Sequence, residues 1–179
     1  METDRIPARI LPDTIEVEIV DNQSHLDADP AFLDGLVRRT LLSEGIEDAS
    51  ISIALVDDAT IRVINRRHLD HDWPTDVISF DLSDPGDFSL TGELVVSAEM
   101  AVATAREAGV APRSELALYV VHGLLHLCGL DDREIEDAEV MRRREGEILA
   151  AEGLINTFPL VGAATTVDDP GRESVRWPR

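Results

Sequence analysis

Lysine is missing from this chain of 179 residues, and cysteine and aromatic residues are scarce. A single cysteine, Cys128, excludes a disulfide within the chain, which favours a reducing, cytoplasmic compartment. Long hydrophobic runs are missing as well. The first residues carry no apolar signal segment, and the longest apolar stretch, residues 116–127, is too short to span a bilayer. We therefore expect a cytoplasmic protein with no membrane partner.

Positive charge is also in short supply, because 16 arginines face 36 aspartates and glutamates, which gives a formal net charge of −20. Backbone phosphates are bound mainly by cations, so this balance alone argues against a nucleic-acid-binding protein. Net charge does not say where the charges lie, however. The arginines cluster at Arg62, Arg66 and Arg67 and again at residues 142–144. Any affinity for RNA must come from these clusters or from a bound metal ion.

Apolar residues make up 44% of the chain, a composition typical of a globular domain. Apolar alternation and helical spacing between caps and glycines predict the elements. The predicted strands cover residues 14–20, 50–56, 77–80 and 93–96; the predicted helices cover residues 30–45, 58–67, 99–108, 114–127 and 133–151, with Ser114 as the cap of the fourth. The predicted fold class is α+β, a small mixed sheet of about four strands packed with about five helices. We assign residues 1–157 to a single domain and residues 158–179 to a loose tail.

The fourth predicted helix carries two histidines on an otherwise apolar surface, and buried histidines need a reason. His122 and His126 are four residues apart, so their rings project from one face and can bind one metal ion. Gly129 is placed to end the helix and turn the chain back, which brings Asp131 or Asp132 within reach. Two nitrogens and one carboxylate leave a coordination position open for water or substrate, as in catalytic sites.

Other metal chemistries fit this pattern less well. In zinc proteases with this spacing, a glutamate after the first histidine acts as the general base, and here that residue is Gly123. Oxygenase iron centres also use two histidines and a carboxylate, but on separate strands. Cys128 lies two residues after His126 and is predicted to point away from the ion as a small core residue.

Two motifs in this order resemble the YbeY family of bacterial metal-dependent endoribonucleases. They are Pro74–Phe80 (PTDVISF) and His122–Asp132 (HGLLHLCGLDD), and Asn65, Gly92 and Glu93 also stand where the family has matching positions. The resemblance covers about residues 50–153. It implies a mixed sheet packed with helices, one zinc ion per chain and a cytoplasmic location. It also implies cleavage of single-stranded RNA in ribosome quality control and at the 3′ end of small-subunit ribosomal RNA.

The chain departs from the family motif at the third metal ligand, where Asp132 replaces a histidine. Carried over by position, the ligands are His122, His126 and Asp132. An aspartate reaches less far than an imidazole, by roughly 1 Å, so the turn must approach closely or the ion must lie off centre. The added negative charge shifts the preference from Zn²⁺ toward harder ions such as Mn²⁺ or Fe²⁺.

A second departure lies ahead of the PTD strand, where Leu69 stands in place of an arginine found in some family members. Arg66 and Arg67 are the nearest substitutes and are weak candidates for a catalytic role. A solvated helix end, with arginines placed favourably for the helix dipole, explains them equally well. His68 and His71 are candidate contacts to the substrate or the metal rim, although single loop histidines usually have neither role.

The metal-site pattern and the family resemblance together predict a metal-dependent endoribonuclease. The resemblance implies single-stranded ribosomal RNA as the substrate, and the edge of strand 77–80 is a candidate shelf for it. No general base can be assigned from the sequence. Asp131 and Glu134 are near the proposed metal ligands, but they are weak candidates, because both also fit a solvated acidic helix start. Three alternatives stay open: a non-catalytic ribosome assembly factor stabilised by metal, a metallopeptidase, and a hydrolase of small phosphorylated compounds. The charge of the chain predicts weak, salt-sensitive binding to free RNA, with specificity supplied by ribosomal partners.

Overall fold

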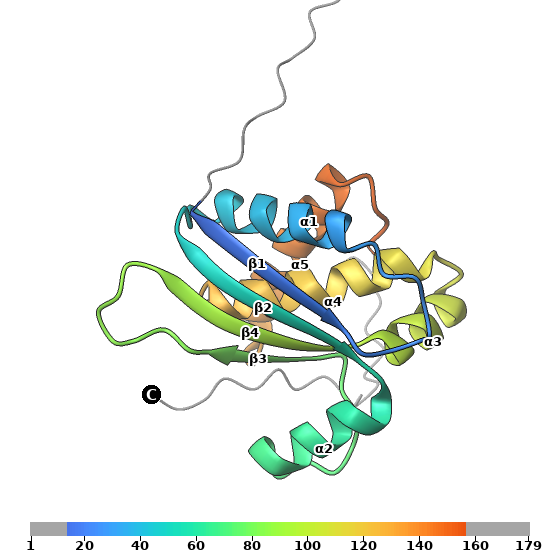
Figure 1. The fold of residues 1–179 in the computed structure, drawn as a ribbon. Helices are drawn as coiled ribbons and strands as arrows, with labels where there is room; N and C mark the ends of the chain where they lie inside the picture. Colours follow the sequence, from blue (N-terminus) through green and yellow to red (C-terminus); the bar gives the residue numbers. More distant parts are fainter. Residues whose placement is uncertain (1–13, 157–179) are drawn as a thin grey trace, which may run out of the picture.

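A four-stranded mixed sheet lies at the centre of the structure, a computed structural model that describes residues 14–156 (Figure 1). The strands are β1 (Ile15–Asp21), β2 (Ala49–Val56), β3 (Val77–Asp81) and β4 (Leu90–Ser97), in the order β1-β2-β4-β3. β1, β2 and β4 run parallel, whereas β3 runs antiparallel to β4 at one edge of the sheet. The predicted mixed sheet of four strands is confirmed.

Five helices complete the α+β fold: α1 (Pro30–Ser43), α2 (Asp58–Leu69), α3 (Ala98–Ala108), α4 (Pro112–Leu127) and α5 (Ile135–Ala151). α1, α4 and α5 share one large core with the sheet, while α2 lies apart from them near the β3 edge and contributes to a second, smaller cluster (Figure 1). α4 is the central helix, since it contacts β3, β4 and the three helices α1, α3 and α5. Its position explains why its sequence is apolar on nearly every side.

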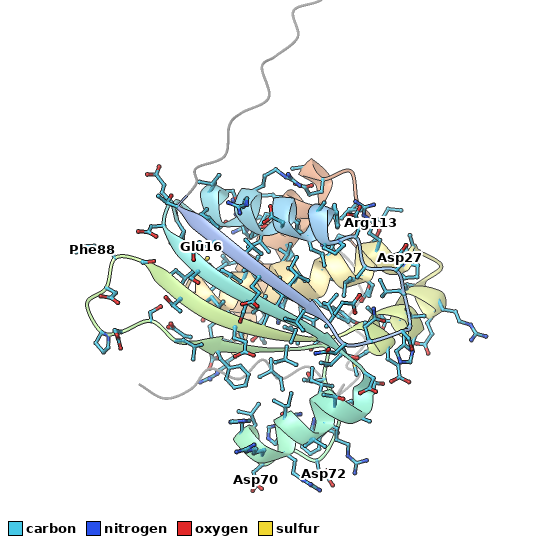
Figure 2. All side chains as sticks on the ribbon, viewed as in Figure 1. Glu16, Asp27, Asp70, Asp72, Phe88 and Arg113 are labelled. Atoms are coloured by element: carbon cyan, nitrogen blue, oxygen red, sulfur yellow. The ribbon has the colours of Figure 1, made fainter. Side chains whose placement is uncertain are left out.

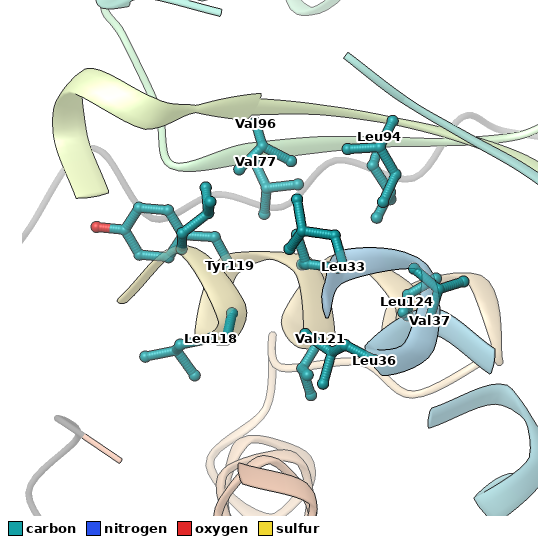
Figure 3. Close-up of a cluster of buried hydrophobic side chains, with 14 of the residues drawn as sticks. Leu33, Leu36, Val37, Val77, Leu94, Val96, Leu118, Tyr119, Val121 and Leu124 are labelled. Carbon is teal, nitrogen blue, oxygen red and sulfur yellow. The ribbon is translucent and has the colours of Figure 1, made fainter. Parts of the chain in front are cut away.

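Successive side chains of each strand point to opposite faces of the sheet, and buried hydrophobic residues therefore form one cluster on each face. The larger cluster lies between the sheet and the helices α1 and α4, and Figure 3 shows Leu33, Val77, Leu94 and Leu124 within it. The smaller cluster lies on the opposite face, where α2 covers the sheet. Its fully or largely buried members are Val56, Ile61, Ile78, Phe80 and Val95. Both faces of β3 are therefore buried, although β3 is an edge strand.

Two helix starts differ by two residues from the sequence-based expectation. Ser114 was expected to cap α4, but the helix begins at Pro112, Ala111 is its N-cap residue, and no side chain makes a cap hydrogen bond. Proline is favoured at the first helical position because its fixed φ suits the helix, and this preference outweighs the capping tendency of Ser114. α5 begins at Ile135 instead of Arg133. At the start of α2 the N-cap residue is Asp57, whose side chain accepts a hydrogen bond from the Thr60 backbone N–H at 2.8 Å.

The described part of the chain contains no helix long and apolar enough to cross a bilayer. The predicted tail, residues 158–179, lies outside the described residues. The single α+β domain is thus described from residue 14 to residue 156, and it contains every candidate site residue named above.

Candidate metal centre

α4 positions the two histidines from inside the protein. From Ser114 to Leu127 every residue of this helix is buried except His122, which is partly buried. The rings of His122 and His126 are 4.6 Å apart between centroids and nearly perpendicular, and their Nε2 atoms are 3.2 Å apart. Ligands of a tetrahedral zinc ion with bonds of about 2.0–2.1 Å lie about 3.3 Å from one another, so this spacing suits a shared ion.

The turn after α4 brings a carboxylate to the same place. Gly129 has a φ of 99°, a left-handed conformation that favours glycine, and the Leu130 N–H donates to the Leu125 carbonyl at 3.0 Å. The chain therefore doubles back, and the Asp132 oxygens lie 3.8 Å from His122 Nε2 and 3.7 Å from His126 Nε2. His122, His126 and Asp132 offer three ligand atoms within 4.8 Å of one another, a group that could hold a metal ion.

The second nitrogen of each ring has its own acceptor, which fixes the ring orientation. His122 Nδ1 lies 2.7 Å from Oε1 of Glu145 on α5, and His126 Nδ1 lies 3.0 Å from the Leu130 carbonyl oxygen. A carbonyl can only accept, so His126 Nδ1 carries the proton, and the carboxylate favours the same tautomer for His122. Both Nε2 lone pairs are then free to bind a metal, the usual arrangement around ligating histidines.

Glu145 was not identified from the sequence, although it is the most buried carboxylate at this site. It is 1% exposed, and its second oxygen, Oε2, is buried without a hydrogen-bond partner in the described structure. The residue belongs to the inward stripe of α5 with Ala138, Met141 and Ile148. A glutamate within an otherwise apolar stripe was the signal that could have identified it, because a buried carboxylate needs a partner.

The electrostatics of the two histidines differ. Burial lowers the pKa of His122, but the Glu145 hydrogen bond, Asp76 and the other nearby carboxylates outweigh burial and raise it. Burial, together with the neighbouring His122, lowers the pKa of His126 to about 4. The carboxylates therefore favour a cation at this point, while His126 stays neutral and ready to bind a metal ion at physiological pH.

A pocket of about 160 Å³ opens beside the histidines. Its lining residues come from α4, α5, the turn between these helices and the position before β3: His122, Ala138, Met141, Arg142, Glu145, Asp132 and Asp76. Asp76, which belongs to the PTD motif, is 7% exposed, and its Oδ1 accepts hydrogen bonds from the Thr75 hydroxyl and the Val77 N–H. These bonds fix the carboxylate at the start of β3, next to the metal group.

Gly123 separates this centre from that of a zinc protease. A Cβ atom at this position would lie 2.8 Å from Leu94 Cδ2 and 3.0 Å from Val77 Cγ2, so the residue faces the sheet and not the pocket. The Ser79 hydroxyl donates to the Gly123 carbonyl oxygen at 3.2 Å, which ties α4 to β3. A glutamate here would enter the core instead of reaching a substrate. The metallopeptidase alternative therefore lacks its base for a steric reason as well.

The weak catalytic candidates do not join the metal group. Arg66 and Arg67 lie in the last turn of α2, at the end where Figure 2 labels Asp70 and Asp72, and neither lines the pocket. Arg66 Nη1 lies 3.9 Å from Asp72 Oδ1. Asp131 Oδ1 accepts a hydrogen bond from the Asp132 backbone N–H at 2.9 Å, so its side chain supports the turn.

The remaining predicted residues also lie outside the metal group. Glu134 occupies the N-cap position of α5 without a side-chain cap bond. His71 stacks on Trp73 with 4.5 Å between ring centroids, and His68 packs edge-on against Phe80. Cys128 packs against the large core, where burial raises the pKa of its thiol to about 12. A thiol of this kind is not ionised at neutral pH and is inert as a metal ligand.

Comparison with known families supports the motif-based expectation. Residues 16–153 match the family model described as Endoribonuclease YbeY. The matched region covers all five helices and the strands β2, β3 and β4 in full, and therefore both motifs and the whole candidate metal centre.

Curated relatives and a solved structure agree with this match. A protein of Carboxydothermus hydrogenoformans named Endoribonuclease YbeY is 40% identical over 139 residues, which cover 76% of this chain and 97% of the relative. One of Rhodopirellula baltica with the same name is 49% identical over 106 residues, and the alignment spans about half (53%) of that protein. A solution structure from Thermotoga maritima is similar with a TM-score of 0.53 and 25% identity, covering 89% of this chain and 99% of the other.

Proposed function

Because the chain belongs to the YbeY endoribonuclease family, we propose that it is a metal-dependent endoribonuclease that cleaves single-stranded RNA. Its substrate is the 3′ end of small-subunit ribosomal RNA, and it acts with the ribosome in the cytoplasm, in rRNA maturation and ribosome quality control. The observation that carries the proposal is the convergence of His122, His126 and Asp132 beside an open pocket. A phosphodiester can approach this group from the pocket side.

His122, His126 and Asp132 are the proposed metal ligands, and the donor set fits a catalytic ion. Two imidazole nitrogens and one carboxylate match the ligands of catalytic Zn²⁺, and Glu145 and the Leu130 carbonyl orient the rings. Asp132 makes Mn²⁺ and Fe²⁺ the competing ions, because a hard carboxylate oxygen replaces a nitrogen. A bound divalent ion supplies Lewis-acid polarisation of a phosphoryl oxygen and a more acidic water.

The chain itself supplies orientation and shielding from solvent. α4 packs on five neighbouring elements, and the hydrogen bonds to Glu145 and to the Leu130 carbonyl orient its two histidine rings. Glu145 holds the Nδ1 proton of His122 and stabilises positive charge at this ring while the reaction proceeds. Ala138 and Met141 form an apolar wall that limits the entry of water.

Metal analysis of the purified protein with matched aspartate variants tests the ligand assignment. Asp132→Ala should lower zinc affinity by more than about a hundredfold, because a direct ligand is lost, whereas loss of a residue that only hydrogen-bonds a ligand gives 10- to 100-fold effects. Asp137→Ala removes an exposed carboxylate from the first turn of α5 that does not line the pocket, and it should bind zinc as the wild type does. Unchanged stoichiometry and affinity in Asp132→Ala would overturn the assignment of this ligand.

Cleavage of single-stranded RNA by the same preparations tests the activity. The wild type should cut the RNA, His126→Ala should not, and Asp137→Ala should retain the activity. Wild-type protein with a full metal complement that leaves ribosomal RNA intact, both alone and with ribosomes, would favour the non-catalytic assembly factor.

A further inference from the structure

The pocket beside the metal centre presents a charge problem to a polyanionic substrate. Three carboxylates line it, those of Asp76, Asp132 and Glu145. A divalent ion balances two of these charges and leaves the pocket negative overall. A backbone phosphate would then be repelled, unless a further cation stands at the pocket.

Arg142 is the one cationic side chain among the pocket-lining residues. It lies on the same face of α5 as the other lining residues of this helix, because Ala138, Met141, Arg142 and Glu145 follow the spacing i, i+3, i+4 and i+7. This periodicity places the guanidinium one turn from Glu145, the carboxylate that holds His122. The geometry of α5 therefore places Arg142 on the side of the helix that faces the metal centre.

Within residues 14–156 the Arg142 side chain has no hydrogen bond and no ion pair. Its neighbours in the arginine run differ. Arg144 is bound to the Glu44 carboxylate, to Glu147 at 2.7 Å and to the Ser43 carbonyl, so its charge is already neutralised. Arg143 is exposed and does not line the pocket. Of the three arginines, only Arg142 lines the pocket and has a guanidinium that no residue between 14 and 156 binds.

We infer that Arg142 binds a phosphate of the RNA backbone and holds the strand across the metal centre. The inference rests on the proposed function, since it takes RNA as the substrate of this pocket. A guanidinium has a planar fork of N–H donors that pairs with two phosphate oxygens at once. Arg142 also supplies the positive charge that, together with a divalent ion, balances Asp76, Asp132 and Glu145.

Arg142→Ala and Arg143→Ala form a matched pair for the test, because each removes one exposed arginine from the same turn of α5. Arg142→Ala should raise KM for single-stranded RNA about tenfold to a hundredfold, the size expected for a charge-assisted hydrogen bond, with a smaller change in kcat. Arg143→Ala should stay within about twofold of the wild type. Arg142→Lys should recover part of the loss.

RNA binding gives a readout that does not depend on cleavage. The probe is a fluorescent single-stranded oligonucleotide with phosphorothioate linkages, which slow hydrolysis, and its anisotropy is measured with metal-loaded and with chelated protein over a range of salt concentrations. Arg142→Ala should reduce the slope of log affinity against log salt by about 0.7, the value for one lost phosphate contact on a single strand. Arg143→Ala should leave the slope unchanged.

Equal KM values and equal salt slopes for Arg142→Ala and Arg143→Ala would overturn the inference. A fall in thermal stability or metal content of Arg142→Ala beyond that of Arg143→Ala would overturn it too, because it would assign Arg142 a structural role. Failure of the proposed function gives a different result: His126→Ala would then keep the cleavage activity of the preparation, whatever happens at Arg142.

Discussion

Helices α4 and α2 both carry residues that the sequence predicts to be functional. Those on α4 are largely buried and fixed by hydrogen bonds, whereas those on α2 are exposed. The His126 side chain on α4 is 7% exposed, with a carbonyl on Nδ1 and a second histidine at Nε2. On α2, the Arg66 side chain is 61% exposed, and its one ion pair with a described residue, Asp72, spans 3.9 Å between groups that are more than half exposed. Surface pairs of this length contribute little, since water and salt screen them.

The difference shows which physical conditions a metal centre needs. A histidine binds metal when it is neutral and correctly oriented, and burial provides both for His126, whose pKa falls to about 4. An exposed arginine is always charged but has no fixed direction, so it attracts a polyanion without positioning it. Arg142 on α5 lies between these extremes, because it is exposed and yet reaches the pocket.

The largest effect on stability should come from placing a glutamate at Gly123 of α4. Gly123→Glu puts a Cβ 2.8 Å from Leu94 Cδ2 and drives a carboxylate into the core between α4 and the sheet. We expect a loss of about 3 kcal/mol or more in the free energy of unfolding, from overpacking and from burial of an unpaired charge. Chemical denaturation measures the loss.

Gly146→Glu on α5 is the matched control for that experiment. A Cβ there meets only the Asn156 side-chain amide, at 3.2 Å, and the residue is partly exposed. We expect a change within about 1 kcal/mol, since the gain in helix propensity offsets the small crowding. Peptidase activity in a stably folded Gly123→Glu protein would contradict the steric account of this position.

The pattern of predicted and missed residues follows the range of the interactions. His122, His126 and Asp132 were found because a helical repeat and a glycine turn place them together within one short segment. Glu145 and Asp76 reach the same site from other elements, 23 residues after and 46 residues before His122 in the numbering, through the packing of α5 and β3 on α4. A local pattern contains no information about such packing.

The fold shows the same division. Strands with strict alternation, such as residues 50–56, were predicted within a residue or two, because one face of each must be buried. The start of α4 was wrong by two residues, since Pro112 and Ser114 are competing local signals and the proline prevailed. The order of the strands, with β4 inserted between β2 and β3, depends on long-range pairing that periodicity does not report.

Replacing Glu145, the carboxylate that contacts His122, tests how much the orientation of a buried histidine contributes to metal binding. The substitution leaves the ligand His122 itself in place. Glu145→Gln keeps the size of the side chain but weakens the bond to His122 Nδ1, which is 2.7 Å long. Zinc affinity should fall about 10- to 100-fold, as for other outer partners of metal-binding histidines. Competition with a chromogenic chelator measures the change.

Glu147→Gln on the same helix is the control, because Glu147 is half exposed and binds only Arg144 among the described residues. It should leave zinc affinity as in the wild type.

In metal-free protein, Glu145→Gln should also lower the pKa of His122, since burial lowers this pKa and the Glu145 hydrogen bond is the strongest influence that opposes burial. NMR titration of the imidazole protons would detect the shift. An unchanged zinc affinity would mean that packing alone orients His122.

The smallest effects should come from the exposed arginines of α2, and these test whether the α2 end belongs to the active site. Arg66→Ala and Arg67→Ala should each change the free energy of unfolding by less than about 0.5 kcal/mol, because Arg66 makes only a long, screened pair and Arg67 lies exposed at the helix end. RNA cleavage should stay within about twofold for the same reason, since neither side chain lines the pocket. Steady-state kinetics of Arg66→Ala, Arg67→Ala and Arg142→Ala, measured side by side, rank their losses of activity directly. If Arg66→Ala or Arg67→Ala lost more activity than Arg142→Ala, the strand of RNA would have to cross α2, and the phosphate contact inferred for α5 would be secondary.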